Sequence, residues 1–143
     1  MTITSEHVAT LRAYLVGNLE DFNSGMDRLK TTQDKVAFNT LLGAAFVHEM
    51  DQRFADSAAV PQIIEFVGKV RAGLDEAKQD QLDPAKAERL IRYSLGPANV
   101  EDIDAKTLGG LQIVLLTASI RDRGLSPEEI DAFLAEVRQL AEA

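Results

Sequence analysis

TLGGLQIVLLTASI, residues Thr107–Ile120, contains no charged side chain and is the stretch that decides the fold. Its apolar side chains fall on every side of a helical wheel, and a helix that is apolar all round is normally buried. The stretch is shorter than the roughly 20 apolar residues that a membrane-spanning helix needs. We therefore predict that a helix over about residues 107–121 forms the centre of a helical bundle.

A second apolar stretch precedes this one in the chain. No charged residue lies between Lys35 and Glu49, and the apolar side chains there again point to more than one side of a helix. We predict a second central helix over about residues 33–54. Gly43-Ala44-Ala45 in this helix and the pair Gly109-Gly110 in the other lack bulk, so we expect the two backbones to come close there, because protein interiors are densely packed.

Four further stretches repeat apolar residues at spacings of three and four, which is typical of an amphipathic helix. The first begins near Ser5 and is expected to continue through a kink at residues 23–25, which are three poor helix formers. The other three are expected over about residues 61–78, over 84–95 and from 127 onward. The last two begin with strong signals, because Pro84 and Pro127 each follow a residue that is favoured as a helix N-cap.

The sequence contains no stretch of alternating β-branched residues, the pattern that is typical of a strand, and no internal repeat. The chain has 143 residues, and single domains commonly have roughly 100–150. We therefore predict an all-α fold with one domain, residues 1–143. It is expected to be a compact bundle of about six helices, in which two apolar central helices, about 33–54 and 107–121, are surrounded by four amphipathic ones.

Composition excludes several classes of function. The formal net charge is −8, and a polyanion repels the phosphates of nucleic acids and the surface of anionic membranes. The chain has no cysteine, which excludes disulfides, zinc–thiolate sites and thiol nucleophiles. The segment MTITSEHVAT lacks the basic and apolar regions of a secretory signal. We expect a cytoplasmic protein with no nucleic-acid partner and no membrane partner.

Motifs for metal binding and catalysis are incomplete in this sequence. His48-Glu49 begins like the HExxH helix of a metalloprotease, but the second histidine is replaced by Gln52. The residues from Asp102 to Asp104 begin like a calcium-binding loop, but the glycine position and the last ligand position of an EF-hand do not match. No serine nucleophile motif is found. We therefore expect no metal site, no cofactor and no catalytic residue, and enzymatic catalysis by carboxylates with His48 ranks last among the functions considered.

The only concentration of basic residues lies on the helix predicted over 84–95. It contains Lys86, Arg89, Arg92 and Tyr93. One interpretation is a solvated basic face with no specific role. The other is a docking surface for an acidic partner protein or for an acidic surface of a second copy.

The sequence thus favours a small acidic non-enzymatic protein that acts through protein–protein contacts, as a homodimer or as an accessory subunit. This hypothesis depends largely on the missing catalytic and nucleic-acid motifs. The alternative is a small-molecule-binding helical bundle with a pocket between the two central helices. Phe38, Phe46 and Leu115 are the residues expected to line that pocket.

Overall fold

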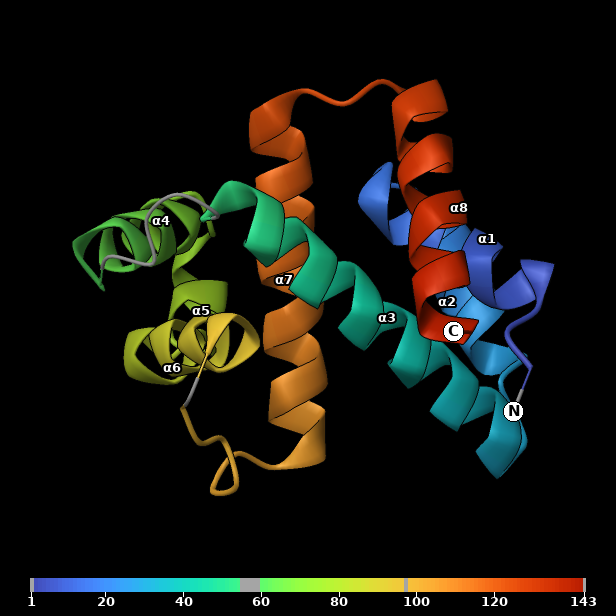
Figure 1. Ribbon diagram of the computed structural model, residues 1–143, viewed down its shortest axis with the longest axis horizontal. Coiled ribbons are helices and arrows are strands. Elements are labelled where there is room, and N and C mark those ends of the chain that lie inside the picture. Colours follow the sequence, from blue (N-terminus) through green and yellow to red (C-terminus); the bar gives the residue numbers. More distant parts are fainter. Residues whose placement is uncertain (1, 55–59, 97, 143) are drawn as a thin grey trace. The chain divides into compact units, whose positions relative to one another are not determined.

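A computed structural model describes residues 2–54, 60–96 and 98–142, and within these ranges all regular secondary structure is helical (Figure 1). The helices are α1 (Ser5–Leu15), α2 (Leu19–Asp27), α3 (Thr32–Arg53), α4 (Val60–Ala72), α5 (Glu76–Gln79), α6 (Pro84–Leu95), α7 (Ala105–Arg123) and α8 (Pro127–Glu142). The all-α class is confirmed. The described part of the chain has eight helices instead of about six, because two of the predicted helices are each divided.

The chain divides into two compact units. Unit 1 consists of Met1–Ala45 and Ile120–Ala143, and unit 2 consists of Phe46–Ser119. Helices α3 and α7 each contribute residues to both units. The single domain over residues 1–143 stays a prediction. No helix within the described ranges is both long enough and apolar enough to cross a membrane.

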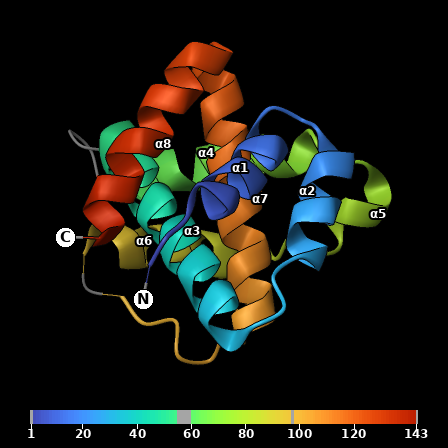
Figure 2. The same cartoon turned by 90° about the vertical axis from the view of Figure 1, so that its right-hand side faces the viewer.

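In unit 1, α1 packs against α2 and α8 (Figures 1 and 2). The predicted first helix is divided at Gly17, not kinked at residues 23–25. Gly17 has a φ of +84°, which a side-chain-bearing residue rarely adopts, and the Asn18 side chain then caps α2 by accepting from the backbone N–H of Asp21. Gly25 lies inside α2 at a close approach, because a Cβ there would be 2.3 Å from the Thr10 hydroxyl oxygen.

In unit 1, side-chain hydrogen bonds fix the N-terminal segment and the start of α8. Nδ1 of the buried His7 accepts from the Thr4 backbone N–H at 2.9 Å, and its Nε2 lies 3.0 Å from a carboxylate oxygen of Asp34. Helix α8 begins with the predicted cap: the Ser126 hydroxyl accepts from the Glu129 N–H, and the Glu129 carboxylate accepts from the Ser126 N–H. The N–H and the hydroxyl of Ser126 hold the pKa of Glu129 below its usual range.

In unit 2, α4 packs against α6. The predicted helix 61–78 is divided after Ala72, and the short α5 begins again with Asp75, whose carboxylate accepts from the Lys78 N–H at 3.0 Å. Helix α6 begins as predicted, because the Asp83 carboxylate accepts from the first free N–H groups and Pro84 occupies the first turn.

The two predicted central helices differ in burial. In α7, no residue from 111 to 120 is exposed, which agrees with an apolar pattern on all sides. Helix α3 has a solvent side, because Val36 and Val47 are 49% and 45% exposed. A Cβ placed on Gly43, Gly109 or Gly110 would meet no other heavy atom within 4 Å. No close approach is therefore found at these three glycines, whereas Gly25 lies at one. The predicted crossing at residues 43–45 stays a prediction.

Candidate functional site

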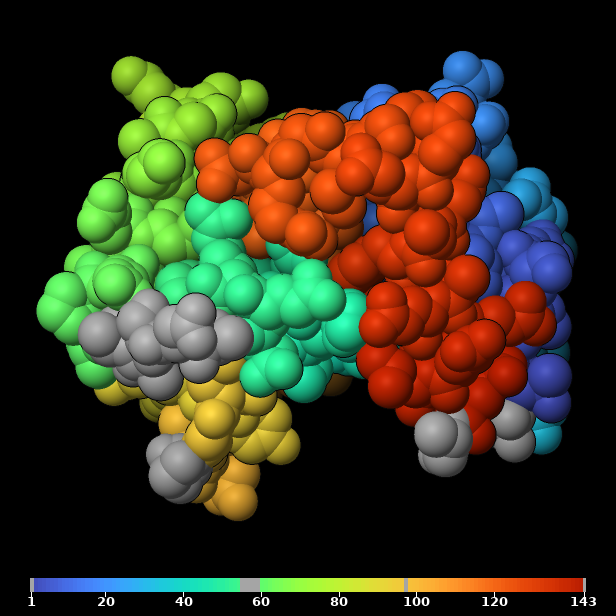
Figure 3. All heavy atoms as spheres, turned by 45° about the horizontal axis from the view of Figure 1, so that its top comes forward, coloured from blue at the N-terminus to red at the C-terminus, as the bar shows by residue number. Residues whose placement is uncertain are grey.

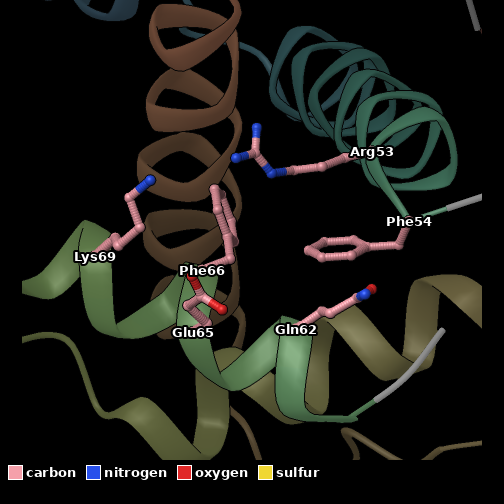
Figure 4. A pocket seen from close by; sticks show the side chains of 6 residues that line it. All are labelled: Arg53, Phe54, Gln62, Glu65, Phe66 and Lys69. Carbon is pink, nitrogen blue, oxygen red and sulfur yellow. The ribbon is translucent and has the colours of Figure 1, made fainter. Parts of the chain in front are cut away.

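A cleft of about 370 Å³ lies in unit 2, at the C-terminal end of α3 and along one side of α4 (Figure 4). Its size lies near the lower limit of the roughly 300–1,000 Å³ that is typical of small-molecule sites. Two of the lining residues come from α3 or the position after it, and four come from α4. They are Arg53, Phe54, Gln62, Glu65, Phe66 and Lys69.

Two phenylalanines form the apolar part of the cleft. The rings of Phe54 and Phe66 meet edge to face, with centroids 5.8 Å apart and an interplanar angle of 75°. Both side chains are largely buried, at 5% and 6% exposure, so only a small part of each ring faces the cleft. The Arg53 guanidinium lies over the Phe66 ring at 4.3 Å from its centroid, a cation–π contact that favours this position of the charge.

A buried polar chain holds Arg53 from inside the unit. Arg53 Nη1 donates to the Ser119 hydroxyl at 3.1 Å, and the same hydroxyl donates to Glu49 Oε2 at 2.6 Å. Glu49 and Ser119 both have no exposed surface. Glu49 and Arg53 are four residues apart on α3 and therefore share one side of that helix. The guanidinium is thus fixed at one end of the cleft by a hydrogen bond and by an aromatic ring.

The polar groups around the cleft carry both signs of charge. Arg53 and Lys69 are cationic, Glu65 is anionic, and Gln62 contributes a neutral amide (Figure 4). Guanidinium and ammonium groups bind carboxylates and phosphates through charge-assisted hydrogen bonds. The cleft therefore has the chemistry to bind a small anion next to two phenylalanines.

The four predicted docking residues all lie on α6, and the structure divides them by exposure. Arg92 and Tyr93 are exposed, with Tyr93 at 53%, whereas Lys86 and Arg89 are half-buried. Helix α6 (yellow) forms part of the face drawn in Figure 3. The docking role of these residues stays a prediction.

The half-buried basic residues of α6 face acidic residues of the segment before α7. Arg89 Nη2 donates to Asp102 Oδ2 at 3.0 Å, but Arg89 Nε is buried and has no acceptor within the described part of the chain. The hydroxyl and N–H of Thr107 hold the pKa of Asp104 below its usual range, and the charge of Lys86 lowers it further.

A second groove, of about 460 Å³, lies in unit 2 on the other side of α4. It involves residues of α4 and α6 and one of α5. Its lining includes Ile64, Gly68, Arg71, Ala72, Gln79, Pro84 and Glu88. Arg92 follows Glu88 by four residues on α6, so the two side chains lie on the same side of that helix, the side of this groove.

The predicted pocket residues are buried. Phe38, Phe46 and Leu115 are each no more than 3% exposed, and none of them lines the cleft or the groove. A pocket formed by these three residues stays a prediction.

The predicted motif residues form no metal centre in the described ranges, since no group of three or more histidine, aspartate or glutamate side chains there is placed to hold an ion. His48 Nε2 instead lies 3.2 Å from the Gln52 side-chain nitrogen. Searches of protein-family models, of curated proteins and of solved structures found no match to this chain.

Proposed function

We propose that this chain is a small acidic cytoplasmic protein that acts through protein–protein contacts, as a homodimer or as an accessory subunit, and not as an enzyme. The observation that carries this proposal is the surface of α6. Arg92 and Tyr93 are exposed there, and exposed arginine and tyrosine are enriched at protein interfaces. The groove between α4 and α6, which includes Ile64 at 47% exposure, extends this surface with apolar area.

The chemistry of α6 favours an acidic partner surface. The acidic segment before α7 already uses one side of the basic cluster, through the Arg89–Asp102 pair. This pair involves one nitrogen of the guanidinium and leaves Nε without an acceptor in the described ranges, so it is weaker than a two-pronged pair. Arg92 offers a further, exposed cation on α6. A partner carboxylate would therefore bind chiefly at Arg92, with Tyr93 as the aromatic contact.

Site-specific crosslinking in cells tests this proposal. A photo-crosslinking amino acid is placed at Tyr93, and in a control strain it is placed at Lys78, an exposed residue of α5. We expect a defined crosslinked species at position 93 only, and we expect Arg92→Glu to abolish it. Mass spectrometry of the adduct distinguishes a second copy from another protein. Equal crosslinking at both positions, or crosslinking that Arg92→Glu leaves unchanged, would refute a role for this surface.

A second candidate function is the binding of a small molecule. The observation that favours it is the cleft at Arg53, where a positioned guanidinium lies beside two aromatic rings. The two candidates use different surfaces of unit 2, so one set of variants can test them separately.

A further inference from the structure

We infer that the Arg53 cleft binds a small organic carboxylate that carries a flat apolar group, of about the size of benzoate. This inference rests on the second candidate function and specifies its ligand. The carboxylate would lie against Arg53 and Lys69, and the apolar group would lie against the exposed parts of Phe54 and Phe66.

The position of Arg53 is the first argument. An arginine that binds a ligand from a flexible surface position loses side-chain entropy when it is ordered. Here the hydrogen bond to Ser119 and the contact with the Phe66 ring already order the side chain. A ligand that meets this guanidinium loses less free energy to side-chain ordering, which is the usual effect of a preorganised binding group.

The distribution of charge is the second argument. Two cations and one carboxylate line the cleft, so its lining carries a formal charge of +1, in a chain whose net charge is −8. The additional carboxylate behind Arg53, that of Glu49, has no exposed surface and accepts from Ser119 on the inner side. The groups that line the cleft itself therefore favour an anion over a cation of the same shape, and the buried Glu49 carboxylate behind Arg53 offsets part of this preference.

The aromatic lining is the third argument. Phe54 and Phe66 line the cleft, and each keeps a small exposed part of its ring. A flat group attached to the carboxylate can contact these rings. A bare inorganic anion would leave the aromatic part of the cleft without a contact.

Titration of the complete, isotope-labelled chain by two-dimensional NMR tests the inference with three probes of one shape: benzoate, benzamide and benzylamine. We expect benzoate to shift the amide signals of residues 53–54 and 62–69, with weaker binding of benzamide and the weakest binding of benzylamine. Lys69 and Glu65 are exposed charged residues that line the cleft, and their substitution leaves the core intact. Lys69→Gln is expected to weaken benzoate binding about two- to fivefold, and Glu65→Gln to strengthen it by a similar factor, which is the usual size for exposed charges.

Matched controls are Lys78→Gln and Glu76→Gln on α5, because these exposed residues make the same changes in charge outside the cleft. Arg53→Gln is expected to weaken benzoate binding at least about tenfold, since it removes the charge-assisted donor. This variant removes a core contact as well, so the Lys69 and Glu65 variants carry the test if it fails to fold.

The outcomes distinguish the carboxylate assignment from small-molecule binding in general. Benzamide or benzylamine binding as tightly as benzoate, or Lys69 and Glu65 variants that behave like their α5 controls, would overturn the carboxylate assignment and leave small-molecule binding in place. If none of the three probes shifts the signals of the cleft, both the ligand assignment and the second candidate function are wrong.

Discussion

Replacement of Ser119 by alanine is the most direct test of the polar chain that holds Arg53. The substitution removes one hydroxyl and leaves the rest of α7 unchanged. This hydroxyl donates to Glu49 Oε2 at 2.6 Å and accepts from Arg53 Nη1 at 3.1 Å. Ser119→Ala therefore takes a donor from a buried carboxylate oxygen and an acceptor from a guanidinium in a single step.

The expected cost follows from burial. Both Ser119 and Glu49 have no exposed surface, so water cannot replace the lost donor without opening the core. A hydrogen bond to a charged group contributes about 1.5–3 kcal/mol, and a buried group left without its partner costs a similar amount. The better helix propensity of alanine offsets roughly 0.5 kcal/mol of this. We expect Ser119→Ala to lower the free energy of unfolding by about 1–2.5 kcal/mol.

Urea unfolding followed by circular dichroism measures the effect, with Ser94→Ala as the matched control. The Ser94 hydroxyl donates to the Ile91 carbonyl of its own helix, so its removal should change the free energy of unfolding by less than about 0.5 kcal/mol. A double-mutant cycle with Glu49→Gln should give an interaction energy of at least about 0.5 kcal/mol, because the two side chains are in contact. If Ser119→Ala unfolds at the same urea concentration as wild type, the buried polar chain does not stabilise the unit and the reasoning fails.

Four further predictions concern packing, helix propensity and capping. Leu115→Ala is expected to lower the free energy of unfolding by roughly 2–5 kcal/mol, because Leu115 has no exposed surface. Gly25→Ala is expected to cost about 1–3 kcal/mol, because the new Cβ would overlap the Thr10 side chain. Gly43→Ala is instead expected to stabilise by about 0.5–1 kcal/mol, since the site is open and helical; urea midpoints measure all three. The pKa of Glu129 is lowered by the backbone N–H and the hydroxyl of Ser126. The contribution of Glu129 to stability is therefore present above the ordinary carboxyl pKa and is lost as the pH falls through the folded pKa. Glu129→Gln should thus destabilise at about pH 7 and progressively less in acid, as urea midpoints across this pH range will show.

Helix ends with a local chemical signal could be predicted from the sequence. The starts of α6 and α8 lie where Asp83-Pro84 and Ser126-Pro127 place them, because the capping side chain and the proline act within a few residues. The burial of α7 was predictable for a related reason. A stretch with no charge on any side has no solvent face, whatever packs around it.

The division of the first predicted helix could not be read from the apolar spacing. Leu11, Leu15 and Leu19 keep the spacing of a continuous helix, although the chain turns at Gly17. After the turn, Leu19 is 52% exposed and no longer belongs to the buried stripe. Periodicity reports on continuous helices, and a left-handed glycine between two short helices can leave it intact.

The polar chain behind the cleft was missed for a different reason. Glu49 follows Phe46 by three residues and precedes Met50, and both of these residues are buried. The spacing therefore places Glu49 on the buried side of α3, which was the signal available in the sequence. The partner, Ser119, lies 70 positions away, and no local pattern connects the two residues.

The buried position of Glu49 and Ser119 behind Arg53 indicates what these two residues do. A buried polar network in place of apolar residues is weak support for stability, because well-packed apolar side chains of similar volume often stabilise a core equally well or better. Stability alone therefore gives no reason for a glutamate and a serine at the two fully buried positions behind Arg53. What the polar chain does, and what apolar side chains would not do, is fix the direction of a guanidinium at the surface. Under the proposed binding of a carboxylate in the cleft, Glu49 and Ser119 are positioning residues, and their effect on ligand binding should exceed what their contribution to stability explains.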